Sequence, residues 1–453
     1  MRNAIHAMLI AGCASVAGTT AAGADIFAGN SPAVLTLTAP FHDLFTRAQS
    51  DTGYHVRGQL TWSDQGSSPV TLDRVEISER GHTSRQTTEC EFPKLKVDLS
   101  DVDRGGTPFE GLKTLKLGTH CGNRTDDELT PKYGRLANER APLREAMVYR
   151  MLQAAGIPTL RARPARVTYV DPDVPDQQPL TRFALLLEDD DEAKARLGGS
   201  GQIGEEDFGS AREAFNPSDT ARLAFAQAMI GNFDWCLRMF QGDIYRCDQR
   251  HPLWNVLAIQ RKDARSLPLP YDFDLSGPVV GRHVWFRQVF SPDFVQPPSS
   301  VSVEVLAQVQ RTRSLFERPL LDETRAYFRA ARSKIEEAIA HSSADPRGQE
   351  LAREYLGAFY DSIDTDARFY GPVVIESGHH ASMTAAGSQP ACDGRSLVPV
   401  GTPVSAPLEV EGALVHVRVL DALWEWAGQN RCDAVHREPV WMPAAAIGTG
   451  YPR

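Results

Sequence analysis

The chain has 453 residues, of which 42% are hydrophobic and 23% charged, with 30 prolines and 35 glycines. This composition excludes a disordered or fibrous protein, and the length predicts two or three domains that each bury a core. The 58 acidic residues outnumber the 48 basic ones, and the resulting net charge of −10 argues against a protein that binds nucleic-acid backbones. Beyond the N-terminus, no apolar run is long enough to span a bilayer.

Residues 1–24 are expected to be an export signal. Arg2 precedes a stretch of apolar and small residues that ends in Ala22-Gly23-Ala24, a typical cleavage site. Alternatively, Ile10–Cys13 resembles a bacterial lipobox, in which Cys13 would be acylated and anchor a lipoprotein. Cleavage after Ala24 is preferred because the apolar segment before Cys13 is short. Either interpretation predicts an exported protein, periplasmic or secreted in the first case.

The remaining cysteines are expected to form disulfides. Without Cys13, six of the seven cysteines remain, and an even number in an exported chain is typical of disulfide pairing. Zinc is the alternative, but the sequence has no Cys-x-x-Cys motif and no histidine pair at ligand spacing beside two cysteines. Proximity in the sequence favours the pairs Cys90–Cys121, Cys236–Cys247 and Cys392–Cys432.

The region 25–187 is predicted to be rich in strands, with one strong helix. Alternating apolar residues or short apolar runs indicate strands at residues 70–77, 95–99, 112–117, 167–170 and 183–187. The segment 141–152 has helical spacing, with Pro142 near its first turn and Gly156 just beyond its end.

The region 188–365 is predicted to be mainly helical. The acidic run 188–192 and the Gly- and acid-rich segment 198–206 are expected to be loops. Helices are predicted near residues 220–230, 319–341 and 348–363, and a short hairpin is predicted from residues 255–259 and 267–271.

Two short segments stand out as candidates for chemistry, Gly231–Trp235 and Pro270–Gly277, with Asn255 between them. An Asp, then an Asn at the head of a hairpin, then an Asp-x-Asp motif is the order that phosphoryl transfer on a kinase-like fold requires. In such a site Asp234 orients or deprotonates the acceptor hydroxyl, while Asn255 and Asp272 hold Mg²⁺ against the nucleotide phosphates.

The same type of site needs a lysine on an N-terminal strand and a glutamate on the following helix. Lys116 and Glu145 occur in that order and context. Each of these residue types is also common on solvated surfaces, so the spacing alone does not decide between a site and a surface.

The chain resembles the spore coat protein H (CotH) kinase family and uncharacterised bacterial envelope proteins related to it, from about Val75 to Ile363. The resemblance is carried by Cys90–Leu95, Leu115–Cys121, Leu143–Ala146, Ile230–Trp235 and Pro270–Gly277. It implies an atypical protein-kinase-like fold with an ATP site between two lobes.

The resemblance also implies roles for single residues. Asp234 would be the catalytic aspartate, Asn255 a metal ligand and Asp272 the metal-binding aspartate, with Asp274 as the second choice. The nucleotide lysine would be Lys116, or Lys96 if the strands are offset, and Glu145 would be its partner.

Several features depart from the family pattern. No Gly-x-Gly-x-x-Gly loop precedes the first strands, and the nearest equivalent, Glu79–Ser84, has a single glycine. Asn255 follows Asp234 by 21 residues instead of a few, and Trp254 stands where histidine is usual. ATP is also scarce in a bacterial periplasm. These departures are compatible with a pseudokinase, a protein with a kinase-like fold but no catalytic activity.

The C-terminal region 372–453 is rich in proline and glycine, with an alternating strand at Val415–Val419. Together with Val400–Val419, the segment Glu438–Ala444 resembles bacterial SH3-like barrels, which implies a small all-β domain that could bind peptidoglycan or peptides.

The expected architecture is therefore α+β. A signal (1–24) precedes a bilobal protein-kinase-like body, with a strand-rich N-lobe (25–187) and a helical C-lobe (188–365), and an SH3-like barrel (372–453) follows. The first functional hypothesis is an exported kinase that binds Mg-ATP and phosphorylates Ser or Thr of an envelope protein. The alternative is a catalytically inactive envelope scaffold that uses its SH3-like tail.

Overall fold

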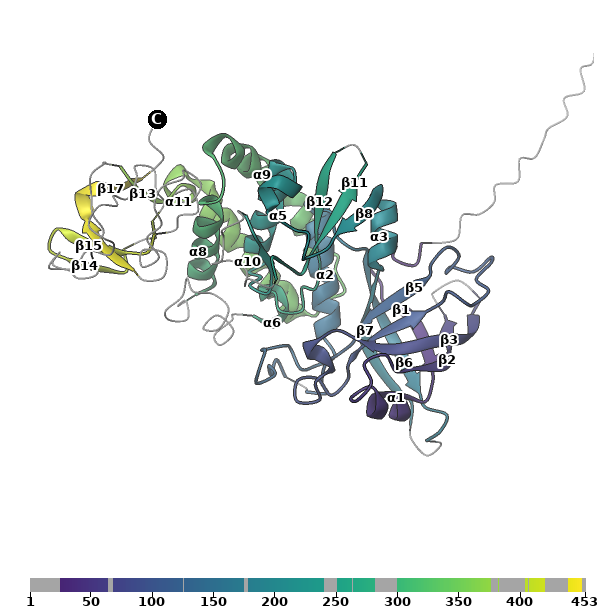
Figure 1. The fold of residues 1–453 in the computed structure, drawn as a ribbon. Coiled ribbons are helices and arrows are strands. Elements are labelled where there is room, and N and C mark those ends of the chain that lie inside the picture. Colours follow the sequence, from purple (N-terminus) through teal and green to yellow (C-terminus); the bar gives the residue numbers. More distant parts are fainter. Residues whose placement is uncertain are drawn as a thin grey trace, which may run out of the picture.

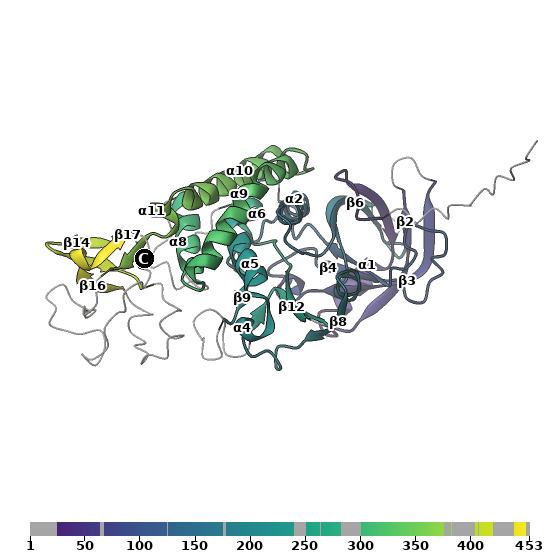
Figure 2. The ribbon, with the colours of Figure 1, turned by 90° about the horizontal axis from the view of Figure 1, so that it is seen from above.

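The computed structural model describes most of the chain between residues 25 and 449. The described ranges are 25–63, 68–124, 126–174, 178–239, 251–262, 264–281, 300–375, 382, 404–405, 407–419 and 439–449. In two perpendicular views the strands of the N-terminal part and the C-terminal strands lie at opposite ends of an elongated molecule, with the helices between them (Figures 1 and 2).

The N-terminal part is a closed barrel of seven strands in the order β1-β2-β3-β4-β5-β7-β6. Neighbouring strands are antiparallel except for β6 and β1, whose parallel pairing closes the barrel. Helix α1 (Phe41–Arg47) and the short helix η1 (Thr83–Arg85) lie between strands. The strands are β1 (Ala33–Thr38), β2 (His55–Trp62), β3 (Val70–Arg80), β4 (Lys94–Asp98), β5 (Thr114–Gly118), β6 (Ala162–Val170) and β7 (Leu180–Leu187).

The two faces of the barrel strands differ because side chains alternate along a strand. Leu95 and Val97 on β4, and Leu117 on β5, are fully buried in the interior cluster. On β7, Leu185 and Leu187 point to the other side and join the core of the helical part. The helical part therefore covers the outer face of β7.

Helix α2 (Ala141–Ala154) lies between the barrel and the other helices (Figures 1 and 2). Ten of its residues are buried, because it packs against β6 and β7 on one side and α9 on the other. Gly156 ends the turn after the helix with φ +76°, and a β-carbon there would lie 2.5 Å from the hydroxyl of Tyr327.

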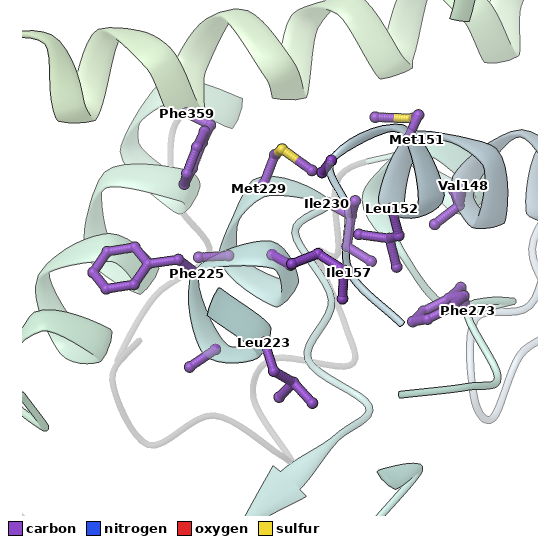
Figure 3. Close-up of a cluster of buried hydrophobic side chains, with 14 of the residues drawn as sticks. Val148, Met151, Leu152, Ile157, Leu223, Phe225, Met229, Ile230, Phe273 and Phe359 are labelled. Carbon is purple, nitrogen blue, oxygen red and sulfur yellow. The ribbon is translucent and has the colours of Figure 1, made fainter. Parts of the chain in front are cut away.

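The helical part has one apolar core. Figure 3 shows side chains of α2, α5 and α10 meeting in it, together with Phe273. Helices α9 and α10 are amphipathic and bury one stripe each, as their apolar spacing predicts. The helices are α3 (Asp190–Arg196), α4 (Ala211–Ala214), α5 (Pro217–Met229), α6 (Gly277–Val280), α8 (Val301–Arg313), α9 (Arg318–Ala340), α10 (Pro346–Asp364) and α11 (Asp366–Phe369).

Two small sheets accompany these helices. The predicted hairpin is present as β11 (Val256–Arg261) and β12 (Ala264–Pro270), and β8 (Gly199–Ile203) pairs with β11. The expectation of a loop at 198–206 was therefore wrong in part: its glycines allow close strand pairing, and β-carbons on Gly199 and Gly201 would collide with side chains of β11. Strands β9 (Cys236–Leu237) and β10 (Leu253–Trp254) form the second sheet.

The expected acidic loop at 188–192 is also different in the structure. Glu188 is fully buried and accepts hydrogen bonds from Arg161 and Arg196. Asp189 caps the N-terminus of α3, accepting from the amide of Asp191. The acidic residues of this run therefore pair with arginines or cap a helix. The sequence of the run alone does not reveal these partners.

The described C-terminal residues form short strands. β13 (Pro372–Val374) pairs with β17 (Ile447–Thr449), and β14 (Glu409–Glu411), β15 (Leu414–Val417) and β16 (Val440–Pro443) form a second sheet, with η2 (Ala444–Ala446) following β16. Most of 372–453 lies outside the described residues, so the SH3-like barrel stays a prediction.

The α+β class is confirmed, with strands first and helices after, and a seven-stranded closed barrel replaces the less specific expectation of a strand-rich region. Among the described helices, none combines the length and apolarity that crossing a bilayer requires.

Candidate functional site

Three aspartates from two separate loops come close together beside the barrel. Asp234 follows α5, and Asp272 and Asp274 follow β12. Burial, together with the negative charges of Asp272 and Asp274, raises the pKa of Asp234 to about 6. The two sequence motifs that stood out are therefore one site in space, and its carboxylates repel one another.

The carboxylate of Asp234 is held by two donors. The indole Nε1 of Trp254 donates to Oδ1 at 2.9 Å, and the side-chain amide of Asn255 donates to Oδ2 at 3.1 Å. The same amide also donates to the backbone carbonyl of Asp234 at 2.6 Å. Trp254 thus takes a direct part in orienting Asp234, and the amide oxygen of Asn255 is the group left to face a cation.

Asn255 and Asp272 both have left-handed backbones, with φ of +53° and +60°. Few non-glycine residues adopt this conformation, although Asn and Asp tolerate it best. The amide of Tyr271 donates to the carbonyl of Asn255 at 3.1 Å, which ties the two unusual positions together. Backbone strain of this kind concentrates at functional sites.

Lys94, the first residue of β4, reaches into the aspartate cluster. Its Nζ lies 2.6 Å from Oδ1 of Asp272 and 2.9 Å from Oδ2 of Asp274. Burial alone would lower the pKa of Lys94, but the charges of Asp272 and Asp274 outweigh it and raise that pKa. Lys94 is therefore a buried, permanently charged ammonium group at the centre of the site.

Arg135, in the segment before α2, is the second cation of the cluster. Its Nε donates to Oδ2 of Asp274 at 3.0 Å, and its Nη1 donates to Glu89 at 3.1 Å. Burial alone would raise the pKa of Asp274, but Lys94 and Arg135 hold it well below its usual range. The other oxygen of Asp274, Oδ1, is buried without a hydrogen-bond partner among the described residues.

Helix α2 fixes the turn that carries these aspartates. Oε1 of Glu145 accepts the amide hydrogen of Phe273 at 3.2 Å, and the hydroxyl of Tyr149 accepts that of Asp272 at 3.1 Å. Glu145 and Tyr149 are one helical turn apart, so they share a face of α2. The rings of Tyr149 and Phe273 pack edge to face at 4.7 Å.

Glu145 sits in the same electrostatic environment. Its burial, with Asp272 and Asp274 nearby, raises its pKa to about 8 despite the opposing charge of Lys94. A carboxyl group whose pKa is raised in this way is common where several acids share one site.

The other two lysines named from the sequence lie on the same barrel face but outside the cluster. Lys116 binds Asp189 and Asp190 at 3.2 and 2.7 Å, at the end of β7. Among the described residues, Asp98 is the one carboxylate within 4 Å of the ammonium group of Lys96, at 3.7 Å. The structure thus brings together Asp234, Asn255, Asp272, Asp274 and Glu145, and the lysine that contacts the aspartates is Lys94.

Lys94, Arg135, Tyr149 and Trp254 were not assigned roles from the sequence. Lys94 had a signal: it is two residues before Lys96 on an alternating strand and so shares its face. Arg135 had none, since it lies in an irregular segment whose path only the fold determines.

Two of the predicted disulfide cysteines are joined. Cys90 and Cys121 form a disulfide, with their Cα atoms 4.5 Å apart. It lines a small pocket together with Lys94, Arg135 and Glu145. Cys236 is also disulfide-bonded. Cys247, Cys392 and Cys432 lie outside the described residues, as does Cys13.

The donor set fits a hard divalent cation. Carboxylate oxygens and an amide oxygen are the ligands that Mg²⁺ takes, and Mg²⁺ usually keeps waters and phosphate oxygens in its remaining positions. The buried Oδ1 of Asp274 has no hydrogen-bond partner among the described residues, and burial with the neighbouring aspartates raises the pKa of Asp234, so both features suit a further cation beside these two residues. Within the described ranges, no three His, Cys, Asp or Glu side chains are already arranged around one metal position.

Comparison with solved structures finds a distant likeness to a kinase. No family model matches the chain, and no curated protein matches it. The crystal structure of the Helicobacter pylori proinflammatory kinase CtkA is similar over 61% of this chain and 94% of that chain, with 10% sequence identity and a TM-score of 0.29. At this level of similarity neither fold nor activity can be transferred.

Proposed function

We propose that the chain is an atypical kinase-like phosphotransferase that binds Mg-ATP between the outer face of the barrel and the helical part. The observation that carries the proposal is the convergence of Lys94, Glu145, Asp234, Asp272 and Asp274 from four segments far apart in the sequence. Phosphoryl transfer needs carboxylates for the cation and acceptor, and a lysine for the phosphates.

Asp234 is the proposed catalytic residue. Its carboxylate, fixed by Trp254 and Asn255, would accept a hydrogen bond from an acceptor hydroxyl and take its proton. A pKa of about 6 leaves it mainly ionised at neutral pH while keeping it basic enough to share that proton. Serine or threonine of an envelope protein is the proposed acceptor.

Asp272, Asp274 and the amide oxygen of Asn255 are the residues proposed to hold magnesium. When bound, the ion would neutralise the phosphate oxygens of the nucleotide. Asp272 and Asp274 now share Lys94 as their cation. Entry of a phosphate group would therefore draw Lys94 away from at least one carboxylate and release that oxygen for the metal.

Glu145 and Lys94 line the same pocket, and Glu145 in its ionised form is proposed to keep Lys94 in place during this exchange, since the carboxylate attracts the ammonium group. Lys116 and Lys96 stay candidates for binding the nucleotide, because they occupy the same barrel face. Export and a peptidoglycan-binding or peptide-binding tail also remain proposals.

A catalytically inactive scaffold is the second candidate. One observation favours it: Lys94 makes close ion pairs with Asp272 and Asp274, so the cluster is partly neutralised without a metal. A protein that never binds a nucleotide would keep this arrangement.

Thermal unfolding with and without Mg-ATP separates the two candidates. A ligand at 100 times its Kd adds about 2.7 kcal/mol of stability, which shifts Tm clearly. We expect a shift for the wild type and for the control Asp101→Asn, whose side chain is exposed on a loop, and a much smaller one for Asp272→Asn. No shift at millimolar Mg-ATP in the wild type would contradict the proposed function.

A further inference from the structure

Four basic side chains form an array on one outer face of the barrel, across strands β3, β4 and β5. Arg80 on β3 is directly opposite Lys94 on β4, and Lys96 on β4 is directly opposite Lys116 on β5. All four alternate with the interior residues Ile77, Leu95, Val97 and Leu115, so they point the same way.

The spacing of this array suits a chain of phosphates. Opposite residues on antiparallel strands have β-carbons about 5 Å apart, and every second residue along a strand is roughly 7 Å away. Like charges placed directly opposite each other destabilise a sheet. A row of cations in this position is therefore expected to bind anions that neutralise its charge.

The protein itself neutralises only part of the array. Lys94 has two close carboxylates and Lys116 has two, whereas Lys96 has one at 3.7 Å. Within the described part of the chain, the side chain of Arg80 has no hydrogen bond or ion pair, and its Nε is buried without an acceptor. An arginine left half-buried in this way costs free energy unless a ligand supplies the acceptor.

Arg80 faces the proposed active site. Arg80 lies directly opposite Lys94 of β4, and its charge also acts on Glu145 and Tyr149 of α2, so it lies on the side of the barrel that faces these groups. It is the last residue of β3, at the edge where Lys94 turns toward the aspartates.

The loop after Arg80 is shaped to fold back over this position. Gly81 has φ +91°, and a β-carbon there would lie 2.4 Å from Oγ of Ser84. Oγ1 of Thr83 accepts a hydrogen bond from Arg135 at 2.8 Å, and Ser84 lines the same pocket as Lys94. The loop is thus tied to the site by its side chains, and its one glycine leaves few backbone amides to bind a phosphate.

We infer that Arg80, together with Lys96, binds the phosphate chain of a nucleoside triphosphate and so replaces a glycine-rich phosphate loop. The guanidinium binds two phosphate oxygens at once through paired N–H donors, which a single lysine does not. This inference rests on the proposed function for the identity of the nucleotide, but the anion site stands on the array itself.

Binding of inorganic tripolyphosphate without Mg²⁺, measured by calorimetry at low salt, tests the anion site alone. We expect Arg80→Gln to weaken binding by at least about tenfold, the loss that follows removal of charge-assisted hydrogen bonds. Arg57→Gln is the matched control, because Arg57 lies on β2, is 66% exposed and pairs with Glu76 only at 3.7 Å. Lys96→Gln, at a half-exposed position, is the second variant in case Arg80→Gln fails to fold, and it should weaken binding several-fold.

The outcomes separate this inference from the proposed function. Equal affinity of wild type and Arg80→Gln for tripolyphosphate, or no binding by the wild type, would overturn the inference. Binding that depends on Arg80, in a protein that Mg-ATP does not stabilise, would support the anion site and contradict the kinase. If Mg-ATP stabilises Arg80→Gln and Lys96→Gln as much as the wild type, the proposed kinase function stands, but Arg80 has no part in nucleotide binding.

Discussion

Two consecutive residues of α2, Arg144 and Glu145, belong to buried charge networks of opposite kinds. Arg144 is fully buried and uses all three guanidinium nitrogens: Nε and Nη2 bind Asp345 at 2.8 and 3.0 Å, Nη2 also binds Asp127, and Nη1 donates to the carbonyl of Val279. Glu145 belongs to the aspartate cluster, which retains an unpaired oxygen on Asp274 and in which burial and the neighbouring aspartates raise the pKa values of Asp234 and Glu145.

The difference shows what a structural network and a binding site each require. The charges in the network of Arg144 are neutralised within the protein. Burial alone would raise the pKa of Asp345, but the hydrogen bonds and charge of Arg144 lower it. In the proposed function, the cluster of Glu145 takes up a further cation on the aspartate side and an anion on the lysine side. We therefore expect substitutions in the first network to change stability and substitutions in the second to change binding and activity.

The largest expected effect is on phosphoryl transfer. Asp234→Asn removes the group that would take the acceptor proton, and a positioned general base is worth about 10²–10⁴-fold in rate. The change should leave the Mg-ATP shift in Tm largely intact. Transfer of labelled phosphate is the measurement, with Asp101→Asn as control, and unchanged transfer by Asp234→Asn would rule out its catalytic role.

The next effect is on stability. Arg144→Met leaves Asp345 and Asp127 without their buried partner, which should lower the free energy of unfolding by about 3–5 kcal/mol. Urea denaturation measures it. The control is Arg347→Met, whose ion pair with Glu350 is exposed and should contribute less than about 1 kcal/mol. Equal losses in the two variants would show that the Arg144 network contributes no more than a surface pair.

A smaller effect concerns pH. Because Asp234 must be ionised to act, activity should fall as the pH drops through about 6. Trp254→Phe removes the indole donor that stabilises the ionised form, so the acid limb should move to higher pH, with a several-fold loss near pH 6 and little loss near pH 8. A pH–rate profile checks this. A uniform loss at all pH values would mean that Trp254 acts only in packing.

The last effect is again on stability and concerns Glu145. With its pKa raised to about 8, the folded state keeps a proton that the unfolded state loses above about pH 4.5, so this group lowers stability as the pH rises between those values. Glu145→Gln should be nearly neutral at pH 5 and relatively more stable at pH 8. Denaturation at both pH values measures the difference, and a stability gap that does not change with pH would contradict the raised pKa.

Much of the fold follows from local patterns. The alternation in 70–77 and 95–99, the helical spacing of 141–152 and the stripes of 319–341 and 348–363 correspond to β3, β4, α2, α9 and α10. The barrel closure does not follow, because β1 and β6 pair in parallel across more than a hundred residues of sequence. Strand β8 was missed since its glycines are typical of a loop until a partner strand is placed beside them.

The candidate site divides in the same way. Asp234, Asn255, Asp272 and Glu145 were identified because their motifs are local and their residue types suit phosphate chemistry. The sequence led to Lys116, with Lys96 as the alternative, and not to Lys94. Sequence spacing does not reveal which of these three lysines on one barrel face lies next to the aspartates. Strand register decides this, since it places Lys94 at the end of β4 and Lys116 beside Asp189 and Asp190.

The amino-acid sequence alone was enough to determine the mild acidity, the order of strands before helices, the chemical character of the motifs and the pairing of Cys90 with Cys121. Only the tertiary structure decided which charges are balanced. Whether a buried charge is neutralised depends on distances of a few ångströms between segments far apart in the chain, and electrostatic energy in a poorly polarisable interior changes steeply over such distances. That is why Arg144 and Glu145, neighbours in the sequence, have different roles in the molecule.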